Sequence, residues 1–326
     1  MFSTAKLPVA SSKIQAVSQA LWYIVPPFLC FVGSSLNILT ITVLLVRRVG
    51  KASTRILLIS LALVDTAVLL GVLFPMWFEI GLGMSPITLI AAICPIHKFT
   101  AYFFLHCASW NVMLITVERL ISVIYPFKAK IICTAKNTSL VIGTVFLFLF
   151  ALNTHLLVFW KQKETRDTCV IATEAYDDFF HFIWQVIDLP FNNGIPFLVI
   201  VACNVSILIA VIRGYSHRRE LQNPGHCVSE QSARMTSMTF MLTTVSVTFI
   251  VLTLPISVFY VVSSFTNLLP VNDLTWLIHD ILTFLSYSNN GINFLLYCLS
   301  GSQFRREVCL MFRCRNLRLA RPINSK

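Results

Sequence analysis

Seven long apolar stretches constrain the fold of this chain more than any other feature of its sequence. A helix needs about 20 apolar residues to cross the hydrocarbon core of a bilayer, and each stretch is that long. Because lipid offers the backbone no hydrogen-bond partners, we expect each stretch to be a helix. The expected spans are residues 22–46, 56–80, 93–124, 140–160, 180–212, 235–265 and 276–299.

The composition supports a membrane protein and excludes several other classes. Hydrophobic residues make up 56% of the chain and charged residues 12%, whereas a soluble domain has about 25% charged residues. This argues against an ordinary soluble enzyme, a disordered chain and a secreted disulfide scaffold. The net charge of +11 is compatible with nucleic-acid binding or with basic loops that remain in the cytoplasm.

The positions of the basic residues favour the second explanation. Most of them fall in the segments 47–55, 128–136, 213–234 and 305–326. Seven spans place all these segments on one side, so the positive-inside rule predicts a cytoplasmic C-terminus and an extracellular N-terminus. The basic residues expected outside are Lys6, Lys13, Lys98, Lys161, Lys163 and Arg166. Nucleic-acid binding is then unnecessary.

The expected organisation is a single bundle with short additions at both ends. Residues 1–21 form an extracellular tail without a signal-peptide pattern, residues 22–299 form the bundle, and residues 300–326 form a basic cytoplasmic segment. A transporter is the remote alternative, but the chain has no internal repeat and only 11 glycines, unlike typical transporters. The chain has no His-Glu-x-x-His motif and no comparable cluster, so the sequence gives no indication of an enzyme.

Asp65 lies near the middle of the second span, where a charged side chain is costly and indicates a function or a buried partner. One interpretation is a structural polar cluster that holds helices together. The other is a site for a cation, with sodium as the candidate, whose occupancy changes the conformation. The candidate partners of Asp65 are Asn37, Asn289, Asn290 and Asn293.

Cys94 lies 25 residues before Arg119, or about 37 Å along a helix, so the two residues fall at opposite membrane faces. Cys94 could therefore pair with Cys169 in the long outer loop, on the oxidising side. Two free thiols are the alternative. Cys309 and Cys314, just after the seventh span, are candidates for lipidation.

Several short motifs occur in a characteristic order along the bundle. They are Gly33-Ser34-Ser35-Leu36-Asn37, Leu61-Ala62-Leu63-Val64-Asp65, Cys94 with Cys169, Glu118-Arg119-Leu120 with Tyr125-Pro126-Phe127, Pro196, Phe249 with Pro255, Asn293-Phe294-Leu295-Leu296-Tyr297, and Ser302-Gln303-Phe304-Arg305-Arg306. In this order they resemble the rhodopsin-like, or class A, G-protein-coupled receptors. The chain departs from the family pattern at Leu120, Asn204, Thr253 and Phe294.

The resemblance implies an all-α membrane protein, a seven-transmembrane helix bundle with a short amphipathic eighth helix. It also implies a Cys94–Cys169 disulfide, a location in the plasma membrane and coupling to a heterotrimeric G protein. The protein would need no cofactor and would not be an enzyme. Membrane lipid would surround the bundle.

The resemblance implies a switch at the cytoplasmic end of the third span. Glu118 holds Arg119 at rest, and activation frees Arg119 toward the G protein and Tyr297. Phe127 contributes to the G-protein contact. The alternative for Arg119 is a simple anchor at the membrane interface. The residues expected to relay activation are Asn37, Asp65, Ser109, Pro196, Phe249, Pro255, Asn289 and Asn293.

Two positions exclude ligand types that other receptors of this kind bind. Ala101 stands where amine receptors have an aspartate, which argues against a small protonated amine. Tyr287 stands where opsins have the retinal lysine, which argues against a photopigment because no Schiff base can form there. The candidate ligand-binding residues at the outer mouth are acidic, aromatic or histidine: Glu79, Tyr102, His106, Trp184, Asp188, Tyr260, Asp280 and Tyr287. Interfacial aromatics and solvated acids are the alternative for any one of them.

An acidic outer mouth favours a cationic ligand, and an amidated peptide bearing an arginine fits this charge. The segment 187–197 is similar to invertebrate neuropeptide receptors of the FMRFamide-receptor kind. We therefore expect a neuropeptide receptor. The alternative is a rhodopsin-like chemosensory or orphan receptor for a small ligand that is not an amine.

Overall fold

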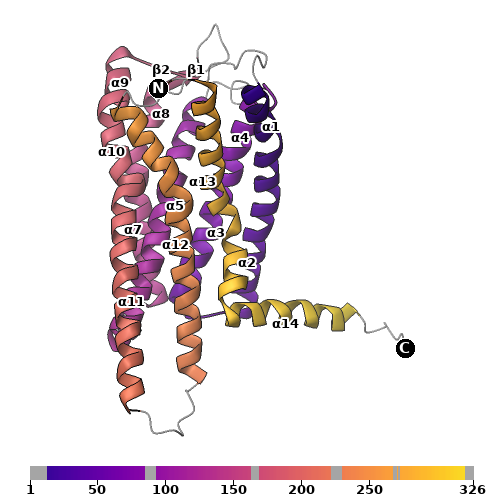
Figure 1. Ribbon diagram of the computed structural model, residues 1–326, viewed down its shortest axis with the longest axis vertical. Coiled ribbons are helices and arrows are strands. Elements are labelled where there is room, and N and C mark those ends of the chain that lie inside the picture. The colour runs from indigo at the N-terminus through magenta and orange to yellow at the C-terminus, as the bar shows by residue number, and fades with distance from the viewer. Residues whose placement is uncertain are drawn as a thin grey trace.

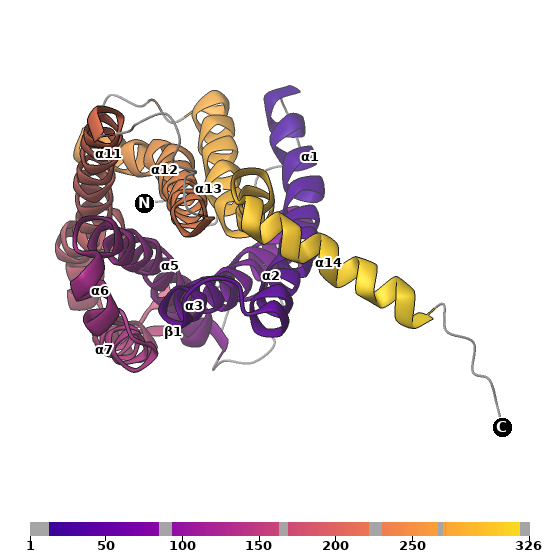
Figure 2. The ribbon, with the colours of Figure 1, turned by 90° about the horizontal axis from the view of Figure 1, so that it is seen from below.

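Helices make up nearly all of the computed structural model, which describes residues 13–84, 93–162, 169–221, 230–266, 270 and 272–319. The long helices run side by side between two ends of an elongated bundle, and α14 leaves one of these ends at a steep angle (Figure 1). Seen along the bundle, the helices form a closed ring in which α13 lies between α12 and α1 (Figure 2). This architecture confirms the expected helix bundle.

Several of the spans are built from consecutive helical segments rather than from one regular helix. The first span consists of α1 (Lys13–Phe28), η1 (Leu29–Gly33) and α2 (Ser34–Arg47). The second consists of α3 (Ala52–Val68), η2 (Leu69–Leu73), α4 (Phe74–Met76) and η3 (Trp77–Gly81). The third is the single helix α5 (Ile93–Ile124). The short α6 (Pro126–Ile132) leads to the fourth span, α7 (Ala135–Asn153) and α8 (His155–Phe159).

The second half of the chain follows the same plan. The fifth span consists of α9 (Glu174–Asp178), η5 (Phe179–Trp184), α10 (Gln185–Leu189), η6 (Pro190–Gly194) and α11 (Ile195–Leu221). The last three helices are α12 (Glu230–Phe265), α13 (Asp273–Ser300) and α14 (Ser302–Leu319).

The expected boundaries agree with the structure for the third span and differ most for the fifth and the first. α5 covers residues 93–124 as expected, whereas α1 begins at Lys13, so part of the expected tail 1–21 is helical. Residues 13–21 include Ser, Gln and Lys, which hide a helix from a search for continuous apolar runs. α11 and α12 likewise continue into the expected loop 213–234.

Six helical segments among the described residues are long and apolar enough to cross a membrane. The seventh expected span, α13, is not among them, although it is long enough and packs within the bundle. Its buried face carries Asp280, Asn289, Asn290 and Asn293. These polar residues face the other helices, so the polar character of α13 reflects the interior of the bundle.

A two-stranded antiparallel hairpin marks one end of the bundle. β1 (Trp160–Gln162) pairs with β2 (Cys169–Ile171), and Trp160 lies opposite Ile171. The expected disulfide is present and joins Cys94, at the start of α5, to Cys169 in β2. We call this the hairpin end and the opposite one the α14 end.

Turns of π-helix interrupt the spans near prolines. η1 follows Pro26 and Pro27, η3 follows Pro75, and η6 begins at Pro190. Proline lacks the N–H group of a regular helix and its ring displaces a carbonyl of the preceding turn. A local π-helical turn lets the freed carbonyls find other donors, so the segment remains helical inside a membrane.

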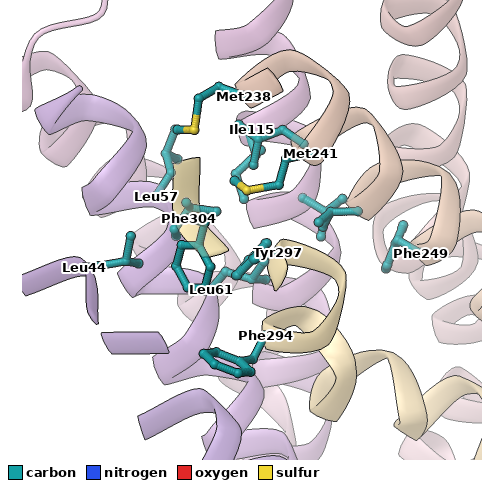
Figure 3. Packing of buried hydrophobic residues seen from close by; sticks show 14 of the residues in the cluster. Leu44, Leu57, Leu61, Ile115, Met238, Met241, Phe249, Phe294, Tyr297 and Phe304 are labelled. Atoms are coloured by element: carbon teal, nitrogen blue, oxygen red, sulfur yellow. The ribbon is translucent and has the colours of Figure 1, made fainter. Parts of the chain in front are cut away.

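The largest hydrophobic cluster lies toward the α14 end. Figure 3 shows Met238 and Met241 of α12 near Tyr297 of α13 and Phe304 of α14, with Ile115 of α5 beside them. The rings of Tyr297 and Phe304 lie with their centroids 5.4 Å apart. These contacts fix the start of α14 against the ends of α12 and α13.

Two glycines allow the first and seventh spans to approach closely. A Cβ atom added at Gly33 would lie 2.9 Å from the Cα atom of Gly291 and 2.7 Å from a methyl carbon of Leu69. No larger side chain fits between these backbones without displacing one of them. Asn37, one turn further along the same helix, is thereby brought against α13.

Candidate functional site

A buried polar cluster occupies the middle of the bundle. Asp65 has 0% exposed surface, and its carboxylate accepts a hydrogen bond from Asn293 at 2.7 Å. Asn37 donates to the backbone carbonyl of Asn290 at 2.9 Å. Asn289 is also buried. Asn293 is therefore the partner of Asp65 among the four asparagines expected from the sequence, and Asn37 holds the backbone of α13 instead.

Several oxygen atoms in the bundle interior have no hydrogen-bond partner within the described part of the chain. They are the Oδ1 atoms of Asn37, Asp65, Asn111, Asn289 and Asn293 and the Oγ atom of Ser34. Asn111, on α5, donates to the hydroxyl of Ser60 at 2.9 Å and was not expected from the sequence. A buried oxygen without a donor is unfavourable by about 1–3 kcal/mol. Carboxylate and amide oxygens suit a hard cation.

A charged pair lies at the α14 end of α5. Arg119 and Glu118 form an ion pair with an N–O distance of 2.8 Å, and both side chains are buried. Two hydroxyls of α3 extend the pair, because Ser53 and Thr54 donate to Glu118 Oε1 at 3.0 and 3.2 Å. Arg119 also donates to the Thr54 hydroxyl. This is the resting arrangement that the resemblance implies.

The other residues expected in the switch surround this pair in different ways. Tyr297 is 1% exposed and packs on Phe304, and no hydrogen bond joins it to Arg119 in the part of the chain that the structure describes. Phe127, on α6, is 81% exposed. An exposed ring at this position is free to contact a partner.

The remaining relay residues lie between α5, α11 and α12. Ser109 donates to the carbonyl of His106 at 3.0 Å, within its own helix. Phe249 is buried and packs edge-on against Phe197, beside the buried Pro196, with ring centroids 5.5 Å apart. Pro255 lies inside α12. Phe249 thus contacts the fifth span through Phe197, the residue after Pro196.

Two departures from the family pattern have local roles. Thr253 donates its hydroxyl to the carbonyl of Phe249 at 2.6 Å, in the turn before Pro255. Asn204 of α11 donates to the hydroxyl of Ser246 of α12 at 2.9 Å. Both residues make hydrogen bonds that the usual aromatic side chains would not make. Asn204 thus joins the fifth and sixth spans directly.

The hairpin end gathers five of the expected ligand-binding residues around α5. Tyr102 packs edge-on against Trp184 with ring centroids 6.0 Å apart. One turn deeper, His106 Nε2 lies 3.4 Å from Asp188 Oδ1. Tyr102 also interacts electrostatically with Asp188 and with Tyr260 of α12. These five side chains come from three different spans.

The other three expected residues lie around the first, second and seventh spans and have partners of their own. Asp280 accepts a hydrogen bond from Ser18 of α1 and lies 3.4 Å from His279. Glu79 interacts electrostatically with Lys98 of α5. The hydroxyl of Tyr287 donates to the sulfur of Met76 at 3.6 Å.

The sequence did not identify Lys98 or His279 as site residues. The Nζ atom of Lys98 lies 4.7 Å from the centre of the Trp160 ring, close enough for a cation–π interaction. His279 Nε2 lies 3.2 Å from the hydroxyl of Tyr260 and so links the seventh span to the sixth. The spacing of Cys94 and Lys98, one helical turn apart, was the available signal for Lys98.

Comparison with known proteins agrees with this geometry. The model of the 7 transmembrane receptor (rhodopsin family) matches residues 36–297. The chain is 25% identical over 292 residues to somatostatin receptor type 5 of Rattus norvegicus, with 85% of this chain and 74% of the relative covered.

Two further relatives match over shorter lengths. B2 bradykinin receptor of Oryctolagus cuniculus is 28% identical over 237 residues, which cover 68% of this chain and 60% of the relative. Neuropeptide receptor 15 of Caenorhabditis elegans is 25% identical over 149 residues, 43% of each chain. The matches thus span less than two thirds of these two relatives.

A bundle of membrane-crossing helices, joined by a disulfide at one end and carrying a buried Glu–Arg pair at the other, defines a seven-helix membrane receptor. The chain belongs to the rhodopsin family of 7 transmembrane receptors. It is therefore a multi-pass G-protein-coupled receptor and not an enzyme. The family match includes α13, which confirms the seventh span.

Proposed function

We propose that this receptor binds a peptide at the hairpin end and activates a heterotrimeric G protein at the α14 end. The observation that carries the proposal is the set of relatives, because receptors for somatostatin, bradykinin, thyrotropin-releasing hormone and galanin all match this chain. The mixture of acidic and aromatic side chains at the hairpin end is suited to a peptide.

The proposed orientation places the hairpin end outside the cell and the α14 end in the cytoplasm of the plasma membrane. Two observations support it. The basic segments 47–55, 128–136 and 305–313 lie at the α14 end of the bundle, as the positive-inside rule requires of the cytoplasmic side. The Cys94–Cys169 disulfide belongs to the hairpin end, and such bonds persist on the oxidising side.

The proposed ligand is an amidated peptide with an arginine, as for receptors of the FMRFamide kind. Its guanidinium group would meet Asp188, whose side chain keeps 21% of its exposure. Glu79 would contribute more weakly, since it already interacts with Lys98. Aromatic rings of the ligand would pack on Tyr102 and Trp184. Tyr260, Asp280 and Tyr287 would complete the site from the sixth and seventh spans.

The proposed switch is the exchange of partners by Arg119. At rest Arg119 is held by Glu118 and Thr54. A ligand that binds another arrangement of the helices more tightly shifts the population toward it. Arg119 then leaves Glu118 and turns toward the G protein and Tyr297, while Phe127 contacts the G protein directly. The relay residues between the two ends transmit the change.

Two further sites belong to this proposal. Sodium would bind at Asp65, which Asn293 contacts, and the unpartnered amide oxygens of the bundle interior are the candidates for further donors. Lipidation would attach the cytoplasmic segment to the membrane. Cys309 is exposed on α14, and Cys314 belongs to the same helix.

Guanine-nucleotide exchange in membranes tests the switch. Replacing Arg119 with Ala should lower receptor-stimulated exchange by at least about tenfold. The variant lacks the positive charge that is proposed to leave Glu118 and turn toward the G protein. Arg306→Ala is the matched control, since Arg306 is a 63% exposed arginine at the same end. Equal exchange by the wild type and Arg119→Ala would contradict the switch.

A screen of amidated peptides on cells that express the receptor tests the ligand class. For an active peptide that contains arginine, Asp188→Ala and Glu79→Ala should each reduce potency by at least about tenfold, since both remove negative charge from the site. Glu174→Ala removes an exposed acid at the same end and should have no effect. Unchanged potency in both site variants would exclude the cationic ligand.

A further inference from the structure

The histidine and aspartate at the inner limit of the ligand site make an unusual pair. His106 has 0% exposed surface, and its Nε2 atom lies 3.4 Å from Asp188 Oδ1. Its other ring nitrogen, Nδ1, lies 2.6 Å from the backbone carbonyl of Tyr102. Neither His106 Nε2 nor Asp188 Oδ1 has a hydrogen-bond partner among the described residues.

The contact with Tyr102 determines the tautomer of the histidine. A carbonyl oxygen can only accept, so Nδ1 must carry the hydrogen and donate it. In the neutral ring Nε2 then has only a lone pair, and it faces a carboxylate oxygen that also only accepts. Two acceptor atoms at this distance need a hydrogen between them. The simplest source is one bridging proton, which makes either the imidazole ring or the carboxyl group the donor.

The position of the pair lets a ligand replace that proton. The Asp188 side chain is 21% exposed, so its carboxylate group can be reached, although Oδ1, which faces His106, is buried. Tyr102, one turn from His106 on α5, packs edge-on against Trp184, and aromatic rings attract a cation. We propose that His106 and Asp188 form the innermost ligand subsite, which takes a positively charged N–H donor in exchange for the proton that bridges them.

This inference rests on the proposed peptide-binding function and specifies how the arginine would be recognised. A guanidinium group supplies several N–H donors and a full positive charge. Its charge stabilises the Asp188 carboxylate and disfavours a second positive charge on His106. The ligand and the proton therefore compete for one subsite, and ligand affinity should fall as the pH is lowered.

Other titratable groups surround the pair and must be separated from it. The phenols of Tyr102, Tyr176 and Tyr260 are on α5, α9 and α12, and phenols do not titrate near neutral pH. His155 packs on Trp184 with ring centroids 4.2 Å apart. His279 contacts Tyr260 and Asp280 on the other side. Both histidines serve as controls.

The test uses the purified full-length receptor in lipid nanodiscs and two dipeptide amides, Arg-Phe-NH2 and citrulline-Phe-NH2. Citrulline has nearly the shape of arginine without its charge. Affinities come from the rise in melting temperature with probe concentration. The arginine probe should bind at least about tenfold more tightly than the citrulline probe at about pH 8, and its affinity should fall at least about tenfold by about pH 5.5.

Three variants separate the subsite from general effects. His106→Asn keeps a donor toward Tyr102 but removes the Nε2 acceptor, so the pH dependence should disappear. Asp188→Asn should abolish the preference for arginine over citrulline. His155→Asn is the matched control, because His155 Nδ1 also contacts a backbone carbonyl, that of Leu152 at 3.0 Å. It should keep the pH dependence, as should His279→Asn.

Each alternative outcome overturns the inference. If the arginine probe has no advantage at either pH, the subsite does not select a cation. If its pH dependence persists in His106→Asn, another group is responsible. Neither result affects the receptor function itself, which the nucleotide-exchange measurement with Arg119→Ala tests without any ligand.

Discussion

Asp65 is a fully buried acid in the middle of a membrane-crossing helix, and one side-chain hydrogen bond, from Asn293, reaches it in the described part of the chain. Ionised carboxylates in such a place are expensive unless they are compensated. The Oδ1 atoms of Asn37, Asn111, Asn289 and Asn293 are among the buried oxygens that have no hydrogen-bond partner in the described residues. Because these oxygens come from the first, third and seventh spans, a cation that bound them would oppose movement of the helices against one another.

Sodium should therefore stabilise the receptor through Asp65. Replacing choline by sodium at constant ionic strength should raise the melting temperature of the wild type, because sodium at ten times its dissociation constant adds about 1.4 kcal/mol to the free energy of unfolding. In Asp65→Asn the effect should vanish. Asp280→Asn, which removes a buried acid bound to Ser18 and near His279, should keep it. A sodium response that persists in Asp65→Asn would place the ion elsewhere.

The residue pairs show where sequence reasoning stops. Asp65 and Arg119 could be recognised because a charge stands out in an apolar or interfacial setting. Ser53 and Thr54, the hydroxyl partners of the Glu118–Arg119 pair, could not be recognised, because small polar residues are common in membrane helices. Which of them meets the charge depends on how the helices are rotated against each other, and local sequence does not determine that rotation.

At the scale of elements, the start of α14 is attached to α12. Ser302 of α14 and Ser237 of α12 share a hydrogen bond with an Oγ–Oγ distance of 2.8 Å, and the Ser302 backbone N–H donates to Ser237 Oγ at 3.2 Å. A Cβ atom added at Gly301 would lie 2.6 Å from the sulfur of Met241. These contacts hold the α14 end of α12 inward.

Weakening this attachment should raise basal activity, since the proposed switch requires the helices at the α14 end to rearrange. Ser237→Ala removes hydrogen bonds worth about 1 kcal/mol, which is about fivefold in a two-state equilibrium. Gly301→Ala should act in the same direction by displacing Met241. The measurement is ligand-free nucleotide exchange in membranes.

Thr244→Ala is the control for this prediction. Its hydroxyl donates to the carbonyl of Phe240, in the same helix, at 2.9 Å. Basal exchange should stay at the wild-type level in this variant. Wild-type exchange in both Ser237→Ala and Gly301→Ala would mean that the α12–α14 contact does not restrain the sixth span.

For the whole molecule, the sequence predicted the number and order of spans better than their ends. α5 agrees at both ends, and Pro126, which follows shortly after it, explains its last residue. α1 begins earlier than expected because its first turns carry polar residues that pack on α13, as Ser18 does through Asp280. Such helix ends depend on contacts with residues far along the sequence, so hydropathy alone does not predict them.

The two ends of the bundle should be on opposite sides of the membrane. α5 has 32 residues and so is about 48 Å long, which exceeds the roughly 30 Å hydrocarbon core. Cys169, near its start, and Cys309, on α14, are therefore separated by the bilayer. A membrane-impermeant maleimide can report the side of each thiol in intact cells.

Labelling of intact cells should require prior treatment with an impermeant reductant, because Cys169 is bonded to Cys94 at the hairpin end, which is proposed to face outward. The double variant Cys94→Ser with Cys169→Ser should lose this reductant-dependent label, because it lacks the two thiols that the reductant would expose. Cys309, which is exposed, should react only after the cells are permeabilised and treated with hydroxylamine to release any thioester-linked lipid, and Cys309→Ser identifies its share. Labelling of Cys309 in intact cells would reverse the proposed orientation, and with it the assignment of the hairpin end to the ligand.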